Sequence, residues 1–354
     1  MGSSKSVLSG RSLEELRALF SPLPPFRAKQ VYRWIIRGIR SFQDMTDLSR
    51  ELREALDSRF TLYSSMVSAR LEDPDGTVKL RITLEDGAKI EGVLLVDGEG
   101  RHTACLSTQA GCPMACVFCK TGALGFRRNL DGGEIVEQFL HIRSAAAGEH
   151  KSPAEGPEIA NIVIMGMGEP LLNLRELRRA LGILTDPQGL GISKRRITVS
   201  TSGIIPGIFD LADQGPEVRL AVSLTTADGE LRKRLMPVTL ANPLPRLKEA
   251  LAYYQRKTRR RITLEVVLLG GLNTRRRDLE ALADFAAGLE VVVNLIPWNP
   301  VAGMEFEGRP LVQPAPREIT EFSEALTKRG IGVTRRLGKG LGVSGACGQL
   351  GEPF

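Results

Sequence analysis

Apolar residues in the first 60 positions recur at helical spacing. Ser12 precedes LEELRALF and is followed three residues later by Glu15, the pattern of a capping box. The segment SPLPP interrupts this period, and FRAKQVYRWIIRGIR (26–40) and residues 46–60 then continue it. The pattern predicts a small helical unit at the start of the chain.

Alternation of apolar and polar residues replaces the helical period from residue 78 onward. VKLRITL (78–84) and KIEGVLLV (89–96) alternate on either side of an Asp-Gly pair, which predicts a β-hairpin. RHTACLSTQ (101–109) predicts a third strand. We expect the chain to divide into a helical unit, a hairpin extension and a large remainder, with bounds 1–65, 66–100 and 101–354.

Strands and helices alternate through the rest of the chain. Six apolar strands are each followed by an amphipathic helix, which builds a parallel sheet covered by helices. Six units are fewer than the eight of a closed barrel, so we expect an open, partial (β/α)6 barrel with its ligand site beyond the carboxyl ends of the strands. The expected strands are 101–109, 159–166, 196–202, 218–225, 262–271 and 289–298, and the helices lie near 133–147, 174–184, 205–213, 243–256, 275–287 and 317–328.

Composition bears on the partner and the compartment. The 354 residues carry a net charge of +7, which weakly favours a polyanionic partner, and no apolar run is long enough to span a membrane. Three of the five cysteines lie in one loop, which argues against a secreted disulfide framework, so we expect a reducing cytoplasm. Residues 26–40 interleave aromatic residues with cations, a pattern of nucleic-acid-binding faces and of solvated helices alike: Arg27, Lys29, Arg33, Arg37 and Arg40.

The stretch GCPMACVFCKTG (111–122) places Cys112, Cys116 and Cys119 at CxxxCxxC spacing. Three thiolates on one loop suit a soft metal centre, although three buried core cysteines or a structural zinc site are the alternatives. Zinc usually takes a second CxxC pair or histidines in step, and the chain has neither. The spacing resembles that of radical S-adenosylmethionine (SAM) enzymes, whose [4Fe-4S] cluster keeps one iron open for SAM.

Glycines and polar residues follow the ends of successive predicted strands. In Gly166-Met167-Gly168-Glu169-Pro170, glycines let a ligand approach the backbone and Glu169 can accept a hydrogen bond from an ammonium group. Each such motif alone is as compatible with a turn or a helix cap. Together, at one edge of a sheet and beside the cysteine loop, they predict a SAM pocket. The other motifs are Ser200-Thr201-Ser202-Gly203, Ser223-Leu224-Thr225 and Asn294 to Pro300.

The order of these motifs resembles the RlmN/Cfr family over nearly the whole chain. Family members are radical SAM enzymes that methylate a ring carbon of adenosine in large-subunit ribosomal RNA. The resemblance implies that activity here, at C2 or C8, with transfer RNA as a second candidate substrate. The matching segments are FRAKQVYRWI, KIEGVLL, TACLSTQAGCPMACVFCKTG, GFRRNLDGGEIVEQ, GMGEPLLN, RRITVSTSG, SLTT, VNLIPWNP and ACGQL.

The resemblance also implies a role for each matching residue. Cys112, Cys116 and Cys119 would hold the [4Fe-4S] cluster. Cys347 would carry the methyl group, Cys105 would be its partner thiol, and Glu91 would be the catalytic carboxylate that accepts a proton. SAM would be lined by Gly168, Glu169, Ser200, Ser223, Leu224, Thr225 and Asn299.

The implied chemistry consumes two equivalents of SAM per turnover. The thiolate of Cys347 takes a methyl group by displacement, and a 5′-deoxyadenosyl radical from a second SAM removes hydrogen from it. The carbon radical adds to adenine, and Cys105 then attacks the sulfur of Cys347 to release the product as a disulfide forms. An external one-electron donor such as flavodoxin is implied, and we expect a monomer without membrane association.

The sequence departs from the family at three places. Thr225 stands where a histidine is usual, Lys120 where a small residue is usual, and GKGLGVSGACGQL lacks the customary acidic residue before Cys347. These differences leave open which nucleotide and which ring carbon is modified. Two other function classes remain: a radical SAM enzyme with another substrate, and a zinc-stabilised RNA-binding protein without catalysis.

Overall fold

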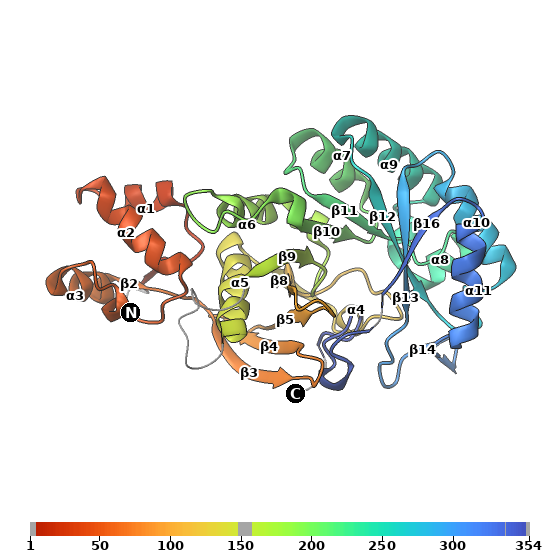
Figure 1. Cartoon of the computed structure of the whole chain (residues 1–354), viewed down its shortest axis with the longest axis horizontal. Coiled ribbons are helices and arrows are strands. Elements are labelled where there is room, and N and C mark those ends of the chain that lie inside the picture. Colours follow the sequence, from red (N-terminus) through yellow and green to blue (C-terminus); the bar gives the residue numbers. More distant parts are fainter. Residues whose placement is uncertain (1–4, 148–157, 337, 352–354) are drawn as a thin grey trace.

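One open sheet of ten strands runs through most of the molecule (Figure 1). The computed structural model describes residues 5–147, 158–336 and 338–351, and within them the sheet has the order β16-β13-β12-β11-β10-β9-β6-β5-β4-β3. Because this order is linear, the sheet does not close on itself. The strands are β3 (Met66–Glu72), β4 (Val78–Thr83), β5 (Lys89–Val96), β6 (His102–Cys105), β9 (Ile159–Ile164), β10 (Ile197–Thr201), β11 (Arg219–Ser223), β12 (Ile262–Leu268), β13 (Val291–Pro297) and β16 (Gly332–Arg335).

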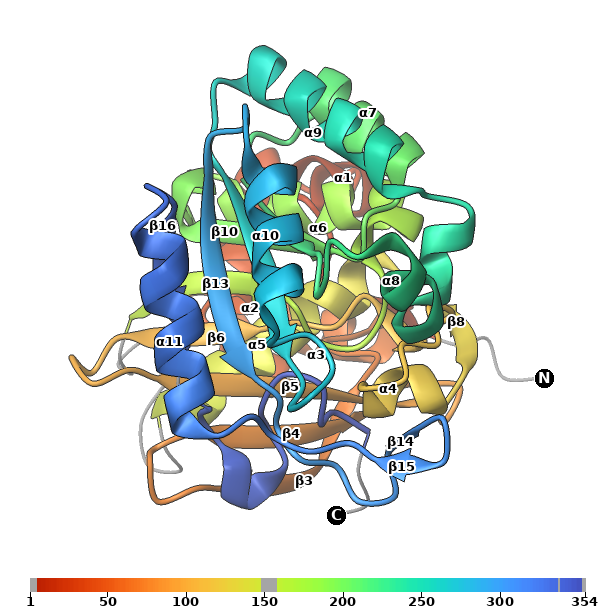
Figure 2. The ribbon, with the colours of Figure 1, turned by 90° about the vertical axis from the view of Figure 1, so that its right-hand side faces the viewer.

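The strands from β6 to β16 run parallel, and helices cover their outer side (Figure 2). This confirms the predicted open, partial (β/α)6 barrel. Its helices are α5 (Gly132–Ala147), α6 (Leu174–Thr185), α7 (Ile205–Gln214), α8 (Gly229–Leu235), α9 (Leu244–Thr258), α10 (Arg276–Ala286) and α11 (Pro316–Thr327). The sequence pattern missed α8 and also β16, because the residues of β16 are mostly exposed and show no apolar period.

The predicted hairpin extends the same sheet with antiparallel strands. β4 pairs with β5, and β5 pairs with β6 through Leu94 opposite Ala104, so the extension is continuous with the parallel strands. β3 adds an outer strand that the sequence did not reveal, since most of its side chains are exposed. No helix among the described residues is long and apolar enough to cross a membrane.

The N-terminal residues form the expected helical unit at one end of the molecule (Figure 1). The capping box of Ser12 and Glu15 is present, which confirms that prediction. The third helix begins at Arg50, later than expected, because the hydroxyl of Ser49 caps it by accepting from the Leu52 N–H. The elements are β1 (Ser6–Val7), α1 (Leu13–Leu19), α2 (Pro25–Ile36), the short 3-10 turn Phe42–Asp44, α3 (Arg50–Arg59) and β2 (Phe60–Thr61).

A buried carboxylate joins this helical unit to α5. Glu137 is fully buried and accepts hydrogen bonds from the hydroxyls of Ser9, Ser64 and Ser65, and from the Ser64 N–H at 2.9 Å. One turn later His141 accepts from Arg40 at Nδ1 and contacts Ser65 at Nε2. Burial, with the charge of Arg40, lowers the pKa of His141 to about 3, so this ring is neutral.

Replacing Glu137 tests how firmly the two parts are joined. Glu137→Ala removes the acceptor of three buried or half-buried hydroxyls, and we expect the free energy of unfolding to fall by about 3 kcal/mol. Urea denaturation followed by circular dichroism measures it. Glu54→Ala, which breaks an exposed ion pair with Arg50, is the control and should change little. Equal losses in the two variants would show that the buried network contributes no special stability.

Candidate active site

The cysteine loop is closed at its base by two short strands. β7 (Gln109–Gly111) pairs with β8 (Phe126–Asn129), and α4 (Lys120–Ala123) lies between them. Gly111 has a φ of 75°, and a Cβ there would lie 1.9 Å from the Gly125 carbonyl oxygen, so no larger residue fits. The Cys112 N–H donates to the same carbonyl at 2.9 Å. Tight backbone contacts therefore fix where the loop begins.

All three cysteines of this loop line a cavity beyond the carboxyl ends of the parallel strands. The structure thus brings together most of the residues predicted from six separate motifs. Trp298, from the predicted motif Asn294 to Pro300, also lines it, as do Met236 and Glu265, which no sequence motif indicated. The predicted residues that line the cavity are Cys112, Cys116, Cys119, Gly168, Glu169, Ser200, Ser223, Asn299 and Cys347.

Of the residues predicted to contact SAM, Leu224 and Thr225 are absent from this lining. The side chain of Leu224 is fully buried in the core. Thr225 is buried with a φ of 60°, and its hydroxyl has no hydrogen-bond partner among the described residues. Their N–H groups both donate to the Glu265 carbonyl, which fixes the backbone after β11. Their contact with SAM stays a prediction.

The three thiols are electrostatically unsuited to ionise alone. Burial raises the pKa of Cys112 to about 12 and also raises that of Cys116 and Cys119; the charges of Cys112 and Cys119 add to the shift at Cys116. A positive centre among them would be needed to hold all three as thiolates, as metal coordination does. Among the described residues, no three Cys, His, Asp or Glu side chains converge to hold a single metal ion. A [4Fe-4S] cluster, whose thiolates bind different irons, fits this donor set.

Gly166 and Gly168 let the segment after β9 pack closely against residues 107–109, which lead into the cysteine loop. A Cβ on Gly166 would lie 2.6 Å from Ser107 Oγ, and one on Gly168, where φ is 105°, would lie 2.6 Å from Gln109 Cβ. This close packing places Glu169 at the cavity wall. Its carboxylate accepts from the Ser202 N–H and hydroxyl, both at 2.7 Å, and from the Leu171 N–H at 3.0 Å.

Arg232 on α8 connects two of the strand ends, and the sequence analysis missed it. The side chain is fully buried and donates to the carbonyls of Ser202 at 2.7 Å, Leu224 at 3.0 Å and Ser223 at 3.2 Å. Burial lowers its pKa to about 10, and the charge of a deprotonated Cys116 opposes this shift. A buried cation therefore lies close enough to the cysteine loop to interact with its charge. Arg232 lies in LRKRL (231–235), where three basic residues in succession gave no signal that one of them is buried.

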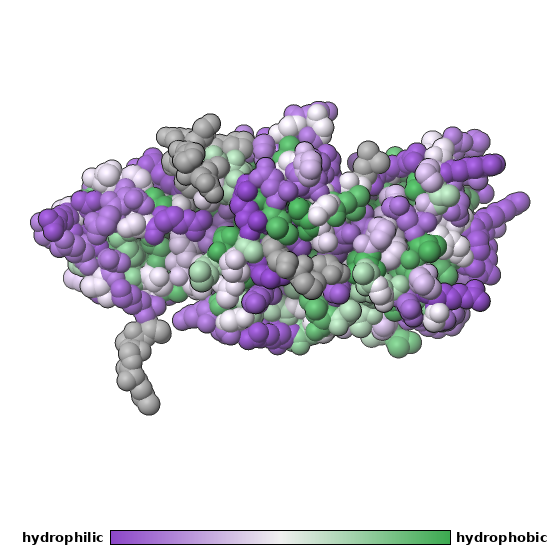
Figure 3. All heavy atoms as spheres, turned by 90° about the horizontal axis from the view of Figure 1, so that it is seen from below, coloured by the Kyte–Doolittle hydropathy of each residue, from purple (hydrophilic) through white to green (hydrophobic). Residues whose placement is uncertain are grey.

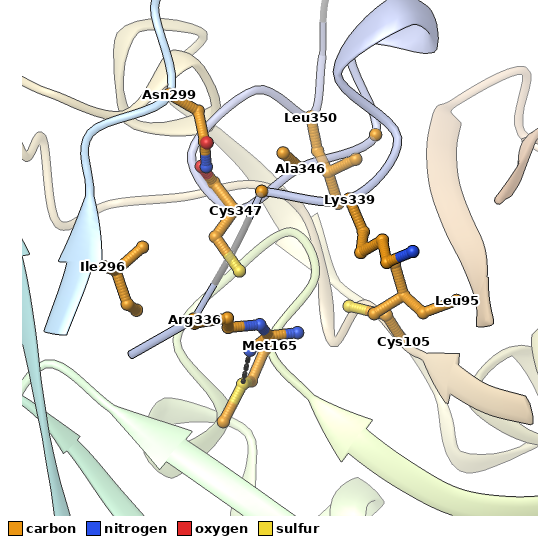
Figure 4. A pocket seen from close by; sticks show the side chains of 12 residues that line it. Leu95, Cys105, Met165, Ile296, Asn299, Arg336, Lys339, Ala346, Cys347 and Leu350 are labelled. Carbon is orange, nitrogen blue, oxygen red and sulfur yellow. Dashed lines mark hydrogen bonds between the residues drawn. The ribbon is translucent and has the colours of Figure 1, made fainter. Parts of the chain in front are cut away.

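A second, smaller cavity adjoins the first and is lined by the remaining two cysteines (Figure 4). Cys105 reaches it from the end of β6 and Cys347 from the C-terminal segment, and their sulfurs point into the same space. Burial, with the charge of Cys347, raises the pKa of Cys105 to about 12. Both cysteines are free thiols, so the predicted disulfide is not formed in this structure.

Arg336 and Lys339 bring positive charge to the second cavity. Arg336 lies between the two thiols and Met165, and its Nη1 contacts the Met165 sulfur at 3.7 Å (Figure 4). The sequence analysis did not single out either residue, because basic residues are common throughout this chain.

Backbone contacts hold Cys347 between the cysteine loop and the β13 end. Asn299 donates to the Cys347 carbonyl at 3.0 Å, and the Lys120 N–H donates to the Gly348 carbonyl at 2.8 Å. Thr121 donates its hydroxyl to the Leu350 carbonyl at 2.8 Å. Residues 347–350 thus pack directly on the loop that carries Cys112, Cys116 and Cys119.

Glu91, from the KIEG motif on β5, lies buried beside the C-terminal segment, which the motif alone did not indicate. It is 3 % exposed, lines neither cavity, and accepts from the Gly351 N–H at 2.8 Å. Burial raises its pKa, and Lys79, with Nζ at 3.5 Å, opposes the shift. The carboxylate therefore contacts the C-terminal segment four residues after Cys347.

Comparison with known proteins agrees with this geometry. The radical SAM superfamily model matches residues 106–286, and the ribosomal RNA large subunit methyltransferase N-terminal domain matches residues 8–62. A protein of Treponema denticola named probable dual-specificity RNA methyltransferase RlmN is 49% identical over 348 residues, which cover 98% of this chain and 96% of that protein. Its namesake in Bacillus subtilis is 41% identical over 327 residues, with 92% and 87% covered.

A solved structure shares the complete fold. The crystal structure of a radical SAM methyltransferase from Sphaerobacter thermophilus matches with a TM-score of 0.90 at 36% identity, and covers 98% of this chain and 99% of that one. Similarity of this extent spans the N-terminal helices, the cysteine loop and the sheet together. The chain therefore belongs to the radical SAM superfamily and, within it, to the RlmN family of RNA methyltransferases.

Proposed function

We propose that the protein methylates C2 or C8 of an adenosine in large-subunit ribosomal RNA, with transfer RNA as a second substrate, through a methyl group carried on Cys347. The observation that carries this proposal is the position of Cys347, which lines both cavities. On one side are the three cysteines and the strand ends that suit SAM. On the other side is Cys105, the thiol that a two-cysteine mechanism needs.

The donor set assigns the cofactors of the proposed reaction. Cys112, Cys116 and Cys119 would hold a [4Fe-4S] cluster, with Gly168, Glu169, Ser200, Ser223, Leu224, Thr225 and Asn299 around SAM. When bound, the cluster supplies the electron that cleaves SAM to a 5′-deoxyadenosyl radical. The proposal uses two equivalents of SAM, one as methyl donor and one as radical source. The buried guanidinium of Arg232 fixes the strand ends that form this pocket.

Cys347 is the carrier in each covalent step. Its thiolate attacks the methyl carbon of SAM and releases S-adenosylhomocysteine. The methylene radical left after hydrogen removal bonds to the adenine carbon, and the one electron in excess on this adduct would return to the cluster. Glu91 is the proposed proton acceptor at that carbon, and burial suits a carboxylate that must take up a proton. Cys105 then attacks the Cys347 sulfur: the S–S bond forms, the bond from sulfur to the methylene carbon breaks, and an external thiol later reduces the disulfide.

The N-terminal helical unit offers a surface for RNA. Phe26 is 55 % exposed at the start of α2, and Arg33 and Arg37 are exposed along it. The guanidinium of Arg37 lies over the Trp34 ring, 5.0 Å from its centroid. The surface of this end is largely hydrophilic (Figure 3). Arg40 is also exposed, but its guanidinium contacts His141 and the Tyr63 ring.

The proposal also covers the domain division, the electron donor, the oligomeric state and the compartment. The chain divides near residues 65 and 100 into an RNA-binding unit, a hairpin extension and a catalytic barrel. Residues 1–4, 148–157, 337 and 352–354 of these units lie outside the described part of the structure. An external one-electron donor such as flavodoxin would serve the cluster. The protein would act as a monomer in the cytoplasm.

Mass mapping of modified adenosines tests the activity. Ribosomal and transfer RNA from cells with and without this protein are digested and compared by liquid chromatography and mass spectrometry. We expect a C2- or C8-methyladenosine at one or a few positions that disappears without the protein. Identical modification maps in the two strains would overturn the proposed function.

Removal of single cysteines of the loop tests the cluster. Cys112→Ala, Cys116→Ala and Cys119→Ala should each lose the iron and the reductive cleavage of SAM together, because three ligands leave no spare. Iron and sulfide content after anaerobic purification, and 5′-deoxyadenosine release, measure this. Cys347→Ala is the matched control and should keep both. Zinc without sulfide in the unmodified protein would instead support an RNA-binding protein without catalysis.

Cys105→Ala separates a resolving thiol from a buried core residue. Cys347 of this variant can still accept a methyl group and bond to adenine, but its bond to RNA cannot be broken. We expect a protein–RNA adduct on denaturing gels that ribonuclease shortens, with a nucleotide mass on the Cys347 peptide. Cys105→Ala with Cys347→Ala should show no adduct. Normal turnover by Cys105→Ala, with only a lowered melting temperature, would exclude the two-cysteine mechanism.

Salt dependence of RNA binding tests the N-terminal surface. Arg33→Ala with Arg37→Ala should reduce the slope of log affinity against log salt by up to about two units, since each lost phosphate contact contributes about one. Arg276→Ala with Arg317→Ala removes the same charge from α10 and α11, at the other end of the molecule, and is the control (Figure 1). Equal slopes for the two double variants would place the RNA elsewhere.

A further inference from the structure

The turn between β3 and β4 holds the segment that leads to Cys347. Asp75 Oδ2 accepts from the Gly340 N–H at 2.9 Å, and Asp73 Oδ2 accepts from the Gly342 N–H at 2.7 Å. Residues 338–351 contain no Asp or Glu of their own. The carboxylates that fix this segment therefore come from the hairpin extension, far away in the sequence.

Each aspartate divides its two oxygens between two tasks. Asp73 Oδ1 accepts from the Asp75 N–H at 3.1 Å, and Asp75 Oδ1 accepts from the Thr77 N–H at 2.9 Å. The Oδ1 atom of each aspartate therefore stabilises the turn to which it belongs. The Oδ2 atoms remain for the glycine amides. Burial acts to raise the pKa of Asp75, but hydrogen bonds from Thr77 and from the Gly340 N–H leave it below its ordinary value. Charge-assisted bonds of this kind are stronger than neutral ones.

The glycines before Cys347 match this turn in shape. A Cβ on Gly340, where φ is 68°, would lie 2.6 Å from Thr77 Cγ2. A Cβ on Gly342 would lie 2.7 Å from Asp73 Oδ2. The glycine-rich sequence of the segment and the DPDGT sequence of the turn are therefore complementary, which explains how the segment is fixed without an acid of its own.

Two buried side chains of the same hairpin contact the segment on both sides of Cys347. Lys79 on β4 donates to the Ser344 carbonyl at 3.4 Å, and Glu91 on β5 accepts from the Gly351 N–H at 2.8 Å. The contacts of the hairpin thus begin seven residues before Cys347 and end four residues after it. The side chain of Cys347 itself is left to line the two cavities.

We propose that Asp73 and Asp75 are positioning residues that hold the Cys347 segment against the hairpin extension, so that the Cys347 sulfur stays where the two cavities meet. The inference rests on the proposed role of Cys347 as methyl carrier. Neither aspartate lines the SAM cavity, so their loss should misplace the carrier thiol without disturbing the cluster loop or SAM. Reductive SAM cleavage and RNA methylation should then become uncoupled.

The test compares Asp73→Asn with Asp75→Asn against a matched turn on the same extension. The double substitution removes both charges, while each asparagine oxygen can still stabilise the turn. Asp97 in the β5–β6 turn accepts from the N–H groups of Glu99 and Arg101 and pairs with the Arg101 side chain, all within its own turn. Asp97→Asn is therefore the control. Gly342→Ala breaks the contact from the other partner and leaves the aspartates intact.

Two readouts are measured. In the protein without cluster, Cys347 alkylation by iodoacetamide is followed by peptide mass, and we expect it to become about tenfold faster in the double variant and in Gly342→Ala. In the reconstituted enzyme, methylated RNA formed per 5′-deoxyadenosine should fall about tenfold, while 5′-deoxyadenosine release without RNA stays at the level of Asp97→Asn.

Each outcome decides the question. Alkylation rates and coupling equal to those of Asp97→Asn in both the double variant and Gly342→Ala would overturn the inference. If the double variant folds poorly, Gly342→Ala alone gives the answer, because its turn is unchanged. If the unmodified protein forms no methylated RNA, the proposed function fails, and the alkylation rates still show whether the aspartates hold the segment.

Discussion

Burial of three thiols at the carboxyl end of a parallel sheet is the constraint on which the rest of the site depends. Desolvation keeps such thiols protonated unless positive charge compensates them. The cavity around them is lined by strand ends, and Arg232 ties these ends together through three carbonyls. A cationic iron–sulfur centre and a buried guanidinium are both consistent with this requirement.

The carrier thiol is positioned by parts of the chain that are distant from it in sequence. Cys347 lies on a segment with little regular structure. Its own carbonyl accepts from Asn299, and its neighbours bond to the cysteine loop and to the hairpin extension. Because these elements all belong to one continuous sheet or its loops, the segment is fixed relative to both cavities. The hairpin is thus more than a connection between the N-terminal helices and the barrel.

The N-terminal unit and the barrel are joined through buried polar groups instead of apolar contacts alone. Glu137 and His141 on α5 meet three serines and Arg40 of the first 65 residues. Directional hydrogen bonds fix orientation more strictly than apolar packing does. An RNA bound on α2 would therefore have a defined position relative to the cavity that contains Cys347.

The sequence by itself determined the helical and strand periods, the open parallel sheet, the capping box at Ser12 and the cysteine loop, because each depends on residues close together in the chain. The family resemblance added Cys105, Cys347 and Glu91. Only the tertiary structure decided which side chains meet: β16 and β3 lack an apolar period, Arg232 and Asp73 have partners far away in sequence, and Leu224 and Thr225 follow a strand end yet do not line the cavity. Periodicity records which face of an element is buried, whereas long-range hydrogen bonds depend on chain geometry that no local pattern encodes.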